Sequence, residues 1–230
     1  MYYAAPSKQD PSKHCVGAAT STSILGPYLP AAESFACPLS EGGAIDPAGF
    51  LDPQTDRLYV VYKVDGNSMN TGGGPCNGNP PANGSLNPTP IMLQEVSTAD
   101  GITKLGSALQ ILDRDESDGP LVEAPSLFYG SDTGLYFLMF SSNCYDTDLY
   151  DISFAYSTCL DNGFVKSKYP LMTTSTGPVR APGGADMSAD GKYALYHGTV
   201  ETFEDSNQPI RYMYAAEADQ IGLDMSAIPC

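Results

Sequence analysis

Two short acidic motifs hold the residues of this sequence best suited to chemistry. Asp46 lies in AIDPAGFLDPQTDRLYVVYK (44–63), and Glu123 lies in VEAPSLFYGSDTGLYFLMFSSNC (122–144). In each motif an acid and a nearby proline stand at the head of a strand-like run, and a turn leads into a second run rich in aromatic residues. Taken singly, an Asp-Pro turn and a solvated loop acid are ordinary features of β proteins. As a pair they suit glycosidic-bond cleavage. One protonated carboxyl donates its proton to the leaving oxygen, and another carboxyl activates water or stabilises charge.

Short β runs separated by turns carry these acids and extend along the rest of the chain. Helical periodicity is hard to find, whereas aromatic and β-branched runs follow Asp/Gly turns along the whole chain. The sequence predicts strands over residues 1–5, 15–23, 57–63, 90–98, 135–142, 151–158, 192–200 and 210–219. This pattern indicates an all-β protein.

Four of these runs repeat one shape, a tight turn followed by an aromatic-rich strand. Aligning Tyr3, Tyr59, Tyr136 and Tyr193 gives spacings of 56, 77 and 57 residues. The long spacing contains residues 66–90, of which 17 of 25 are Gly, Asn or Pro, and we interpret this segment as a loop insertion. A β unit that repeats every 50 to 60 residues is typical of propeller blades of four strands. An irregular β-sandwich is the alternative.

A propeller would explain how two distant acids come together. The loops that lead into the innermost strands converge on the central axis, so Asp46 and Glu123 are expected to face one shallow pocket. The first repeat begins in mid-pattern at Met1. We therefore expect one propeller domain over residues 1–230 with about four blades, the first of which is incomplete at its start.

Composition limits the partners. The formal net charge of −16 and the pI near 4.1 oppose binding to nucleic acid or to an anionic membrane surface. The sequence contains no stretch approaching 18 apolar residues, so no membrane-spanning helix is expected. The balance suits a secreted protein that acts on neutral ligands. We expect a monomer.

Six cysteines indicate disulfides and an oxidising compartment. Proximity favours Cys15–Cys37 and Cys144–Cys159, although six cysteines permit 15 pairings. The sequon at Asn83 also fits secretion, whereas the opening MYYAAPSKQD is not a signal peptide. We expect an extracellular protein whose front end is missing from this chain. The only histidines are His14 and His197, and no Cys/His cluster has zinc spacing, so no metal or other cofactor is expected.

The two acidic motifs resemble those of glycoside hydrolase family 43. CVGAATSTSILGPYLP (15–30) and APGGADMSADGKYALYHG (181–198) are also similar to segments of that family, and the likeness covers essentially the whole chain. The resemblance implies that residues 1–230 are one catalytic domain, a five-bladed β-propeller with about four blades present and its first blade missing. It implies that this domain hydrolyses arabinose- or xylose-containing polysaccharides with inversion. It implies α-L-arabinofuranosidase, β-xylosidase or arabinanase activity, with arabinan, arabinoxylan or xylan as partners.

Carried over residue by residue, the resemblance assigns Glu123 as the general acid. It assigns Asp46 as the aspartate that orients this acid and raises its pKa, which a nearby like charge does by favouring the protonated form. Lesser candidates for sugar contacts are Phe50, through a ring face, and the polar residues Ser142, Asn143 and Arg211.

Two departures from the family pattern affect the expected activity. The family's general base lies in a first blade that this chain lacks, and Gly184 stands where many members carry a histidine that holds an axial metal or water. The alternative function is therefore a catalytically inactive carbohydrate-binding propeller, or a fragment without its base. We interpret His197 as a packed strand histidine. A scaffold propeller that contacts proteins through its loops is a third, weaker alternative.

Overall fold

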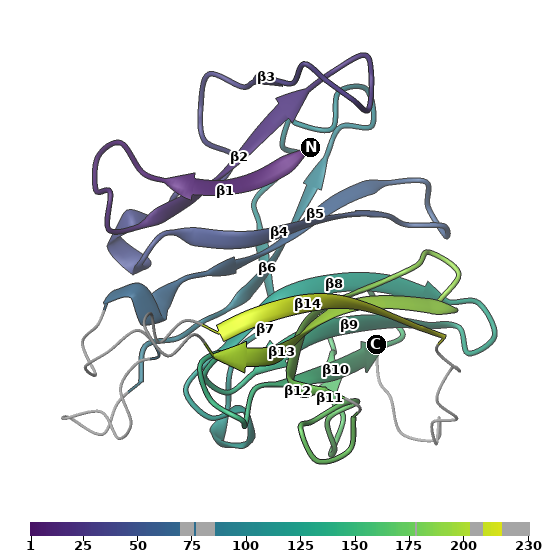
Figure 1. Cartoon of the computed structure of the whole chain (residues 1–230). Coiled ribbons are helices and arrows are strands. Elements are labelled where there is room, and N and C mark those ends of the chain that lie inside the picture. Colours follow the sequence, from purple (N-terminus) through teal and green to yellow (C-terminus); the bar gives the residue numbers. More distant parts are fainter. Residues whose placement is uncertain (70–75, 77–85, 178, 203–208, 218–230) are drawn as a thin grey trace. The chain divides into compact units, whose positions relative to one another are not determined.

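Two compact units, Met1–Asp113 and Arg114–Cys230, make up the chain in the computed structural model. The structure describes residues 1–69, 76, 86–177, 179–202 and 209–217. Each unit contains two antiparallel β-sheets, whose strands Figure 1 labels in chain order. The prediction of an all-β protein is confirmed.

The first unit holds a three-stranded and a four-stranded sheet. Strands in each sheet follow one another in sequence order, as expected when consecutive strands are joined by turns. The first sheet consists of β1 (Tyr2–Pro6), β2 (His14–Thr20) and β3 (Leu29–Pro30), and the second of β4 (Ala44–Leu51), β5 (Leu58–Val64), β6 (Ile91–Val96) and β7 (Leu109–Leu112).

The second unit repeats this plan with a four-stranded and a three-stranded sheet. Its first sheet consists of β8 (Val122–Gly130), β9 (Leu135–Ser142), β10 (Asp151–Ser157) and β11 (Val165–Lys166), and its second of β12 (Arg180–Met187), β13 (Tyr193–Thr202) and β14 (Pro209–Glu217).

Helical structure is confined to short 3₁₀ turns in the described residues: η1 (Leu39–Glu41), η2 (Gly66–Met69) and η3 (Glu116–Asp118). Among the described residues, no helix is long and apolar enough to cross a membrane. Most of the expected loop insertion, with the sequon at Asn83, falls outside the described residues. Its assignment as an insertion stays a prediction.

The repeat inferred from the tyrosines corresponds to the sheets. Tyr3, Tyr59, Tyr136 and Tyr193 lie on β1, β5, β9 and β13, one in each of the four sheets. The eight predicted strands all occur, with ends that differ by a few residues. The short strands β3, β7 and β11 were not predicted, because two to four residues carry too little pattern to recognise. Strand β12 was also missed, because its proline and two glycines are atypical of a strand interior. Strands β4 and β8 correspond to the strand-like runs at the heads of the two acidic motifs.

Each unit has its own apolar core. In the second unit the core lies around Phe137 and Phe154, and it includes Ile152, Ala185 and Tyr196 from three strands. In the first unit a second cluster of buried residues contains Val16, Phe35, Ala44, Val60, Tyr62, Val64 and Val96. All eight residues of β9 are buried, as expected for a continuous apolar run at the centre of a sheet.

The first strand of three sheets contains the same backbone irregularity. Asp46 in β4, Ala124 in β8 and Ala181 in β12 have left-handed φ values of 54°, 52° and 45°, and each directly precedes a proline. The pairing register with the next strand shifts at each of these places, which defines a β-bulge. Bulges bend a strand and redirect its side chains, and they are frequent next to active sites.

The predicted disulfide between Cys15 and Cys37 is confirmed. Cys144 and Cys159 are also disulfide-bonded, as is Cys76. The pairing of Cys144 with Cys159 stays a prediction.

Central packing in the second unit can be tested with two leucines. Leu138 on β9 is 0 % exposed and Leu149 is 69 % exposed. Leu138→Ala should lower the free energy of unfolding by about 3 kcal/mol, because it removes buried methyl groups and leaves a cavity. Leu149→Ala should change it by less than about 0.5 kcal/mol. Urea unfolding followed by tyrosine fluorescence measures both, and equal effects would contradict the burial of Leu138 at the centre of the sheet.

Candidate active site

Glu123 lies at the head of β8, one residue before the bulged Ala124. Its side chain is only 8 % exposed, and its Oε1 accepts a hydrogen bond of 2.6 Å from the hydroxyl of Tyr150. A buried carboxyl needs such partners, since burying a charge without them is costly. The solvated loop acid considered as the alternative is therefore excluded for Glu123.

The register of the sheet explains why these two residues meet. Glu123 pairs with Ser141, and Ser141 pairs with Ile152, so the three side chains lie on one face of the sheet. Tyr150 lies two residues before Ile152 and so shares that face. On the same face, the Ser141 hydroxyl accepts a hydrogen bond of 2.9 Å from the backbone N–H of Gly184.

Tyr150 joins Glu123 to two cationic or titratable groups from the last sheet. The ring of His197 on β13 stacks on that of Tyr150, with centroids 6.0 Å apart and planes 14° apart. The guanidinium of Arg211 on β14 lies 5.9 Å from the Tyr150 ring and donates a hydrogen bond of 2.8 Å to the carbonyl of Tyr145. Glu123, Tyr150, His197 and Arg211, which we call the acid cluster, therefore come from three strands and one connecting segment.

His197 is neutral at ordinary pH. Burial and then the positive charge of Arg211 lower the pKa of His197 from 6.5 to about 4, although the charge of Glu123 acts in the opposite direction. Nδ1 of His197 and Nε of Arg211 are buried atoms without a hydrogen-bond partner in the described part of the chain. Buried polar atoms of this kind call for a partner from solvent or ligand.

Gly183 and Gly184 make room for the acid cluster. A Cβ on Gly183 would lie 2.0 Å from Cε1 of Tyr150, and a Cβ on Gly184 would lie 2.9 Å from Cδ2 of His197. Gly184 also has a φ of +57°, a conformation that side chains rarely adopt. A histidine at position 184, which many family members carry, would thus collide with His197 in this chain. Gly184 offers no side-chain ligand for a metal ion.

Ser142 and Asn143, predicted to contact sugar, belong to a neighbouring network around Asp151. The Ser142 hydroxyl donates to Asp151 at 2.8 Å, and the Asn143 amide donates to the same carboxyl at 3.2 Å. Burial raises the pKa of Asp151, and the hydrogen bonds from Ser142, Ser153 and Asn143 oppose this shift. Ser142 pairs with Val122 and Asp151, so it lies on the sheet face opposite Glu123.

Asp46 and Phe50 lie on β4 in the first unit. Asp46 is partly buried and occupies the bulged position itself, so its counterpart in β8 is Ala124 rather than Glu123. Phe50 is buried and pairs with Tyr59. The joint site of Asp46 and Glu123, and the sugar contacts of Phe50, Ser142, Asn143 and Arg211, stay predictions.

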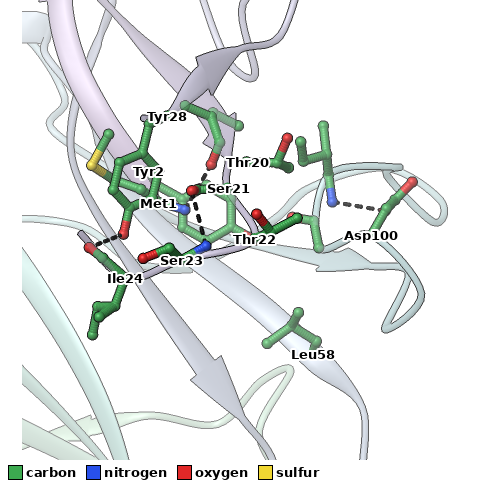
Figure 2. A pocket seen from close by; sticks show the side chains of 14 residues that line it. Met1, Tyr2, Thr20, Ser21, Thr22, Ser23, Ile24, Tyr28, Leu58 and Asp100 are labelled. Atoms are coloured by element: carbon green, nitrogen blue, oxygen red, sulfur yellow. Dashed lines mark hydrogen bonds between the residues drawn. The ribbon is translucent and has the colours of Figure 1, made fainter. Parts of the chain in front are cut away.

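The first unit also has a pocket of about 470 Å³ at the turns that follow β2 and β6 (Figure 2). Hydroxyl-bearing residues line much of it, but the Asp100 carboxylate beside it is occupied by the backbone N–H groups of Ile102 and Thr103. Tyr28 similarly donates to the carbonyl of Ile24. Asp46 is not among the lining residues, and the pocket therefore gives no support to the predicted site.

Sequence reasoning missed Tyr150 and the neutral state of His197. Tyr150 stands outside the aligned repeat. The signal that could have identified it is its position two residues before Ile152, whose side chain lies on the same sheet face as Glu123. His197 is indeed packed in a strand, as interpreted, but its stack on Tyr150 places it in the acid cluster.

Comparison with known proteins agrees with the sequence resemblance. The sequence model of Glycosyl hydrolases family 43 matches residues 1–217. No curated protein matches the chain significantly in sequence.

Several solved structures are similar over nearly the whole chain. A thermostable family-43 glycoside hydrolase has a TM-score of 0.72 and 22 % identity, and the match covers 100 % of this chain and 72 % of that protein. An endo-arabinase from Bacteroides thetaiotaomicron has a TM-score of 0.63 and 14 % identity, with coverages of 91 % and 67 %. An endo-1,4-beta-xylanase from the same organism has a TM-score of 0.61 and 20 % identity, with coverages of 95 % and 70 %.

At these identities the structural likeness establishes the fold. The family's solved structures are five-bladed β-propellers, and the four sheets of this chain correspond to blades. The predicted fold class is confirmed.

The lowered pKa of His197 predicts a pH-dependent stability. Between about pH 6.5 and pH 4 the unfolded chain binds a proton at this histidine and the folded chain does not, so stability falls as the pH falls. From pH 7 to pH 4.5 this contribution should be about 1–2 kcal/mol, after solvent screening of a half-buried group is allowed for. His197→Gln should reduce the loss of stability by that amount in urea unfolding at the two pH values. His197 is the only histidine of the second unit, and an unchanged pH dependence in the variant would contradict this prediction.

Proposed function

Because this chain belongs to glycosyl hydrolase family 43, we propose that it hydrolyses glycosidic bonds in arabinose- or xylose-containing plant polysaccharides with inversion of configuration. The proposed activities are those of an α-L-arabinofuranosidase or a β-xylosidase. Two similar structures, those of an endo-arabinase and an endo-1,4-beta-xylanase, support pentose polymers such as arabinan, arabinoxylan and xylan as substrates.

The observation that carries this proposal is the buried carboxyl of Glu123 at the head of β8. Its hydrogen bond to Tyr150 orients it, and the cluster around it contains an arginine and a neutral histidine. A general acid must be held within hydrogen-bond reach of the oxygen that it protonates. A buried and oriented carboxyl meets this requirement better than a solvated one.

In the proposed reaction, Glu123 gives its proton to the glycosidic oxygen while water attacks the anomeric carbon. The bond from that carbon to the leaving oxygen breaks, and a base takes a proton from the water. Asp46 raises the pKa of Glu123 through its like charge, which keeps the acid protonated until the bond breaks. The residue that serves as base has no assignment in this chain, so binding without turnover is the alternative function.

Arg211 and His197 are suited to hold the sugar. Arg211 Nε is a buried donor without a partner in the described residues, and His197 Nδ1 is a buried ring nitrogen in the same state. A sugar hydroxyl both donates and accepts, so it can pair with either atom. Phe50 on β4, and the polar groups of Ser142 and Asn143, are the further proposed sugar contacts.

We also propose that the protein is exported and acts as a monomer without a cofactor. The Cys15–Cys37 disulfide supports an oxidising compartment. The net charge of −16 supports a neutral polysaccharide as partner and opposes binding to nucleic acid or to anionic membranes.

The assignment of the acid predicts the effect of Glu123→Gln. The amide keeps the shape of the side chain but has no proton to give, so kcat/KM on arabino- or xylo-oligosaccharides should fall by about 10³-fold. Release of reducing pentose measures this, with Glu116→Gln, an exposed acid of the same unit, as the control. An active Glu123→Gln enzyme would exclude Glu123 as the acid. Oligosaccharide binding by a wild-type protein without turnover would support the binding function instead.

The role of Asp46 predicts a shift in the pH profile. Asp46→Asn removes a negative charge that favours protonated Glu123, so the pKa of the acid falls. The decline of kcat/KM at high pH should therefore begin about one pH unit lower. Asp56→Asn makes the same charge change at an exposed turn of the same unit and should leave the profile unchanged. A profile that stays in place in Asp46→Asn would exclude the proposed role.

A further inference from the structure

We propose that Tyr150 is the positioning residue of the general acid: its hydroxyl fixes the carboxyl plane of Glu123, and two glycines and His197 hold its ring in place. This inference rests on the proposed function, since it concerns the residue that the proposal assigns as the acid. No motif of the sequence assigns a role to Tyr150.

The contact between the two residues is short and shielded from solvent. The Tyr150 hydroxyl lies 2.6 Å from Oε1 of Glu123, and the two side chains are 3 % and 8 % exposed. Hydrogen bonds to carboxylates are stronger than those between neutral groups, and they gain strength where water is excluded. A bond of this kind restricts rotation of the carboxyl about its last torsion, which otherwise has a broad range.

The ring of Tyr150 cannot move away easily. It lies so close to Gly183 that a Cβ there would approach Cε1 to 2.0 Å. The stacked ring of His197 lies 6.0 Å from it, and the guanidinium of Arg211 lies 5.9 Å from its centre. His197 in turn occupies the space beside Gly184. The hydroxyl position is therefore set by packing from the neighbouring sheet rather than by the torsions of Tyr150 alone.

This arrangement allows Glu123 to change its protonation state without losing its orientation. Oε1 accepts the hydrogen bond from Tyr150 both as a carboxylate oxygen and as the carbonyl oxygen of the acid. The proton to be transferred then belongs on Oε2, in a direction fixed by the carboxyl plane. A fixed direction increases the rate, because it selects the reactive geometry before the bond breaks.

The hydrogen bond also affects the acidity of Glu123. A donor favours the ionised form of a carboxyl, so Tyr150 lowers the pKa of Glu123 relative to the same site without the hydroxyl. Asp46 and Tyr150 are thus proposed to act in opposite directions on one group. The guanidinium of Arg211 and the ring of His197 also face the Tyr150 ring, and Asp151 follows Tyr150 in the chain.

The first test measures this acidity without requiring turnover. In the full chain labelled with ¹³C at the glutamate carboxyls, Glu123→Gln identifies the Glu123 signal. Tyr150→Phe removes the hydroxyl and keeps the ring, and it should raise the pKa of Glu123 by about one pH unit. Tyr129→Phe removes a hydroxyl near the far end of β8 and should leave that pKa unchanged. An unchanged pKa in Tyr150→Phe would overturn the proposal even if the chain proves inactive.

The second test separates positioning from general damage to the fold. The phenolate of an activated aryl glycoside can leave without being protonated, because its phenol is acidic. The sugar that leaves when an oligosaccharide is cleaved needs a proton from the general acid. Tyr150→Phe should therefore lose about 10- to 100-fold in kcat on oligosaccharides and much less on an activated aryl glycoside, with little change in KM. Equal losses on both substrates would assign Tyr150 a structural role only.

A second variant guards against misfolding of the first. Gly183→Ala places a methyl group against the Tyr150 ring and should raise the pKa of Glu123 in the same direction, with the hydroxyl still present. If both variants leave the pKa of Glu123 unchanged, the inference is wrong. If wild type hydrolyses no pentose substrate but both variants shift that pKa, the proposed function fails and the positioning of Glu123 stands.

Discussion

The candidate site depends on one backbone constraint, the bulge at the head of the first strand of three sheets. An antiparallel strand alternates its side chains between two faces, so a regular ladder leaves little freedom to redirect one of them. At Asp46, Ala124 and Ala181 a left-handed residue directly before a proline interrupts the ladder. Left-handed φ costs a non-glycine residue about 1–2 kcal/mol, and the surrounding pairs on both sides of each bulge maintain it. Such strain is typically kept where a site needs it.

The second unit couples this bulge to the burial of a carboxyl. Glu123 lies just before the bulge, and Tyr150 reaches it from the segment that leads into β10. The close packing requires glycines at positions 183 and 184, because any side chain there would collide with Tyr150 or His197. The position of Glu123 therefore depends on the strained bulge, on the two glycines and on the buried hydrogen bond together. A change in any of them would alter the acid cluster.

The departure from the family pattern at position 184 also has a physical explanation. A histidine there would need space that the ring of His197 already fills, and it would need a left-handed backbone that favours glycine. The imidazole of the acid cluster comes from His197 on β13. Burial and Arg211 keep that imidazole neutral, so Arg211 supplies the fixed positive charge of the acid cluster.

The all-β class, eight of the strands, the fourfold repeat of an aromatic strand and the two acidic motifs could be predicted from the sequence alone. Turn residues and alternating or continuous apolar runs are local signals. They can be recognised without knowing which residues lie nearby in the folded protein. Three features of the site follow from the folded structure and could not be predicted. Asp46 lies at its bulge whereas Glu123 lies one residue before its own, and Ser142 lies on the face opposite Glu123. Tyr150 donates a hydrogen bond to the acid and stacks on His197. These facts depend on strand register and on packing between sheets, where residues tens of positions apart meet. A single sequence carries no local trace of such contacts, because many residue types can fill each position until its neighbours are known.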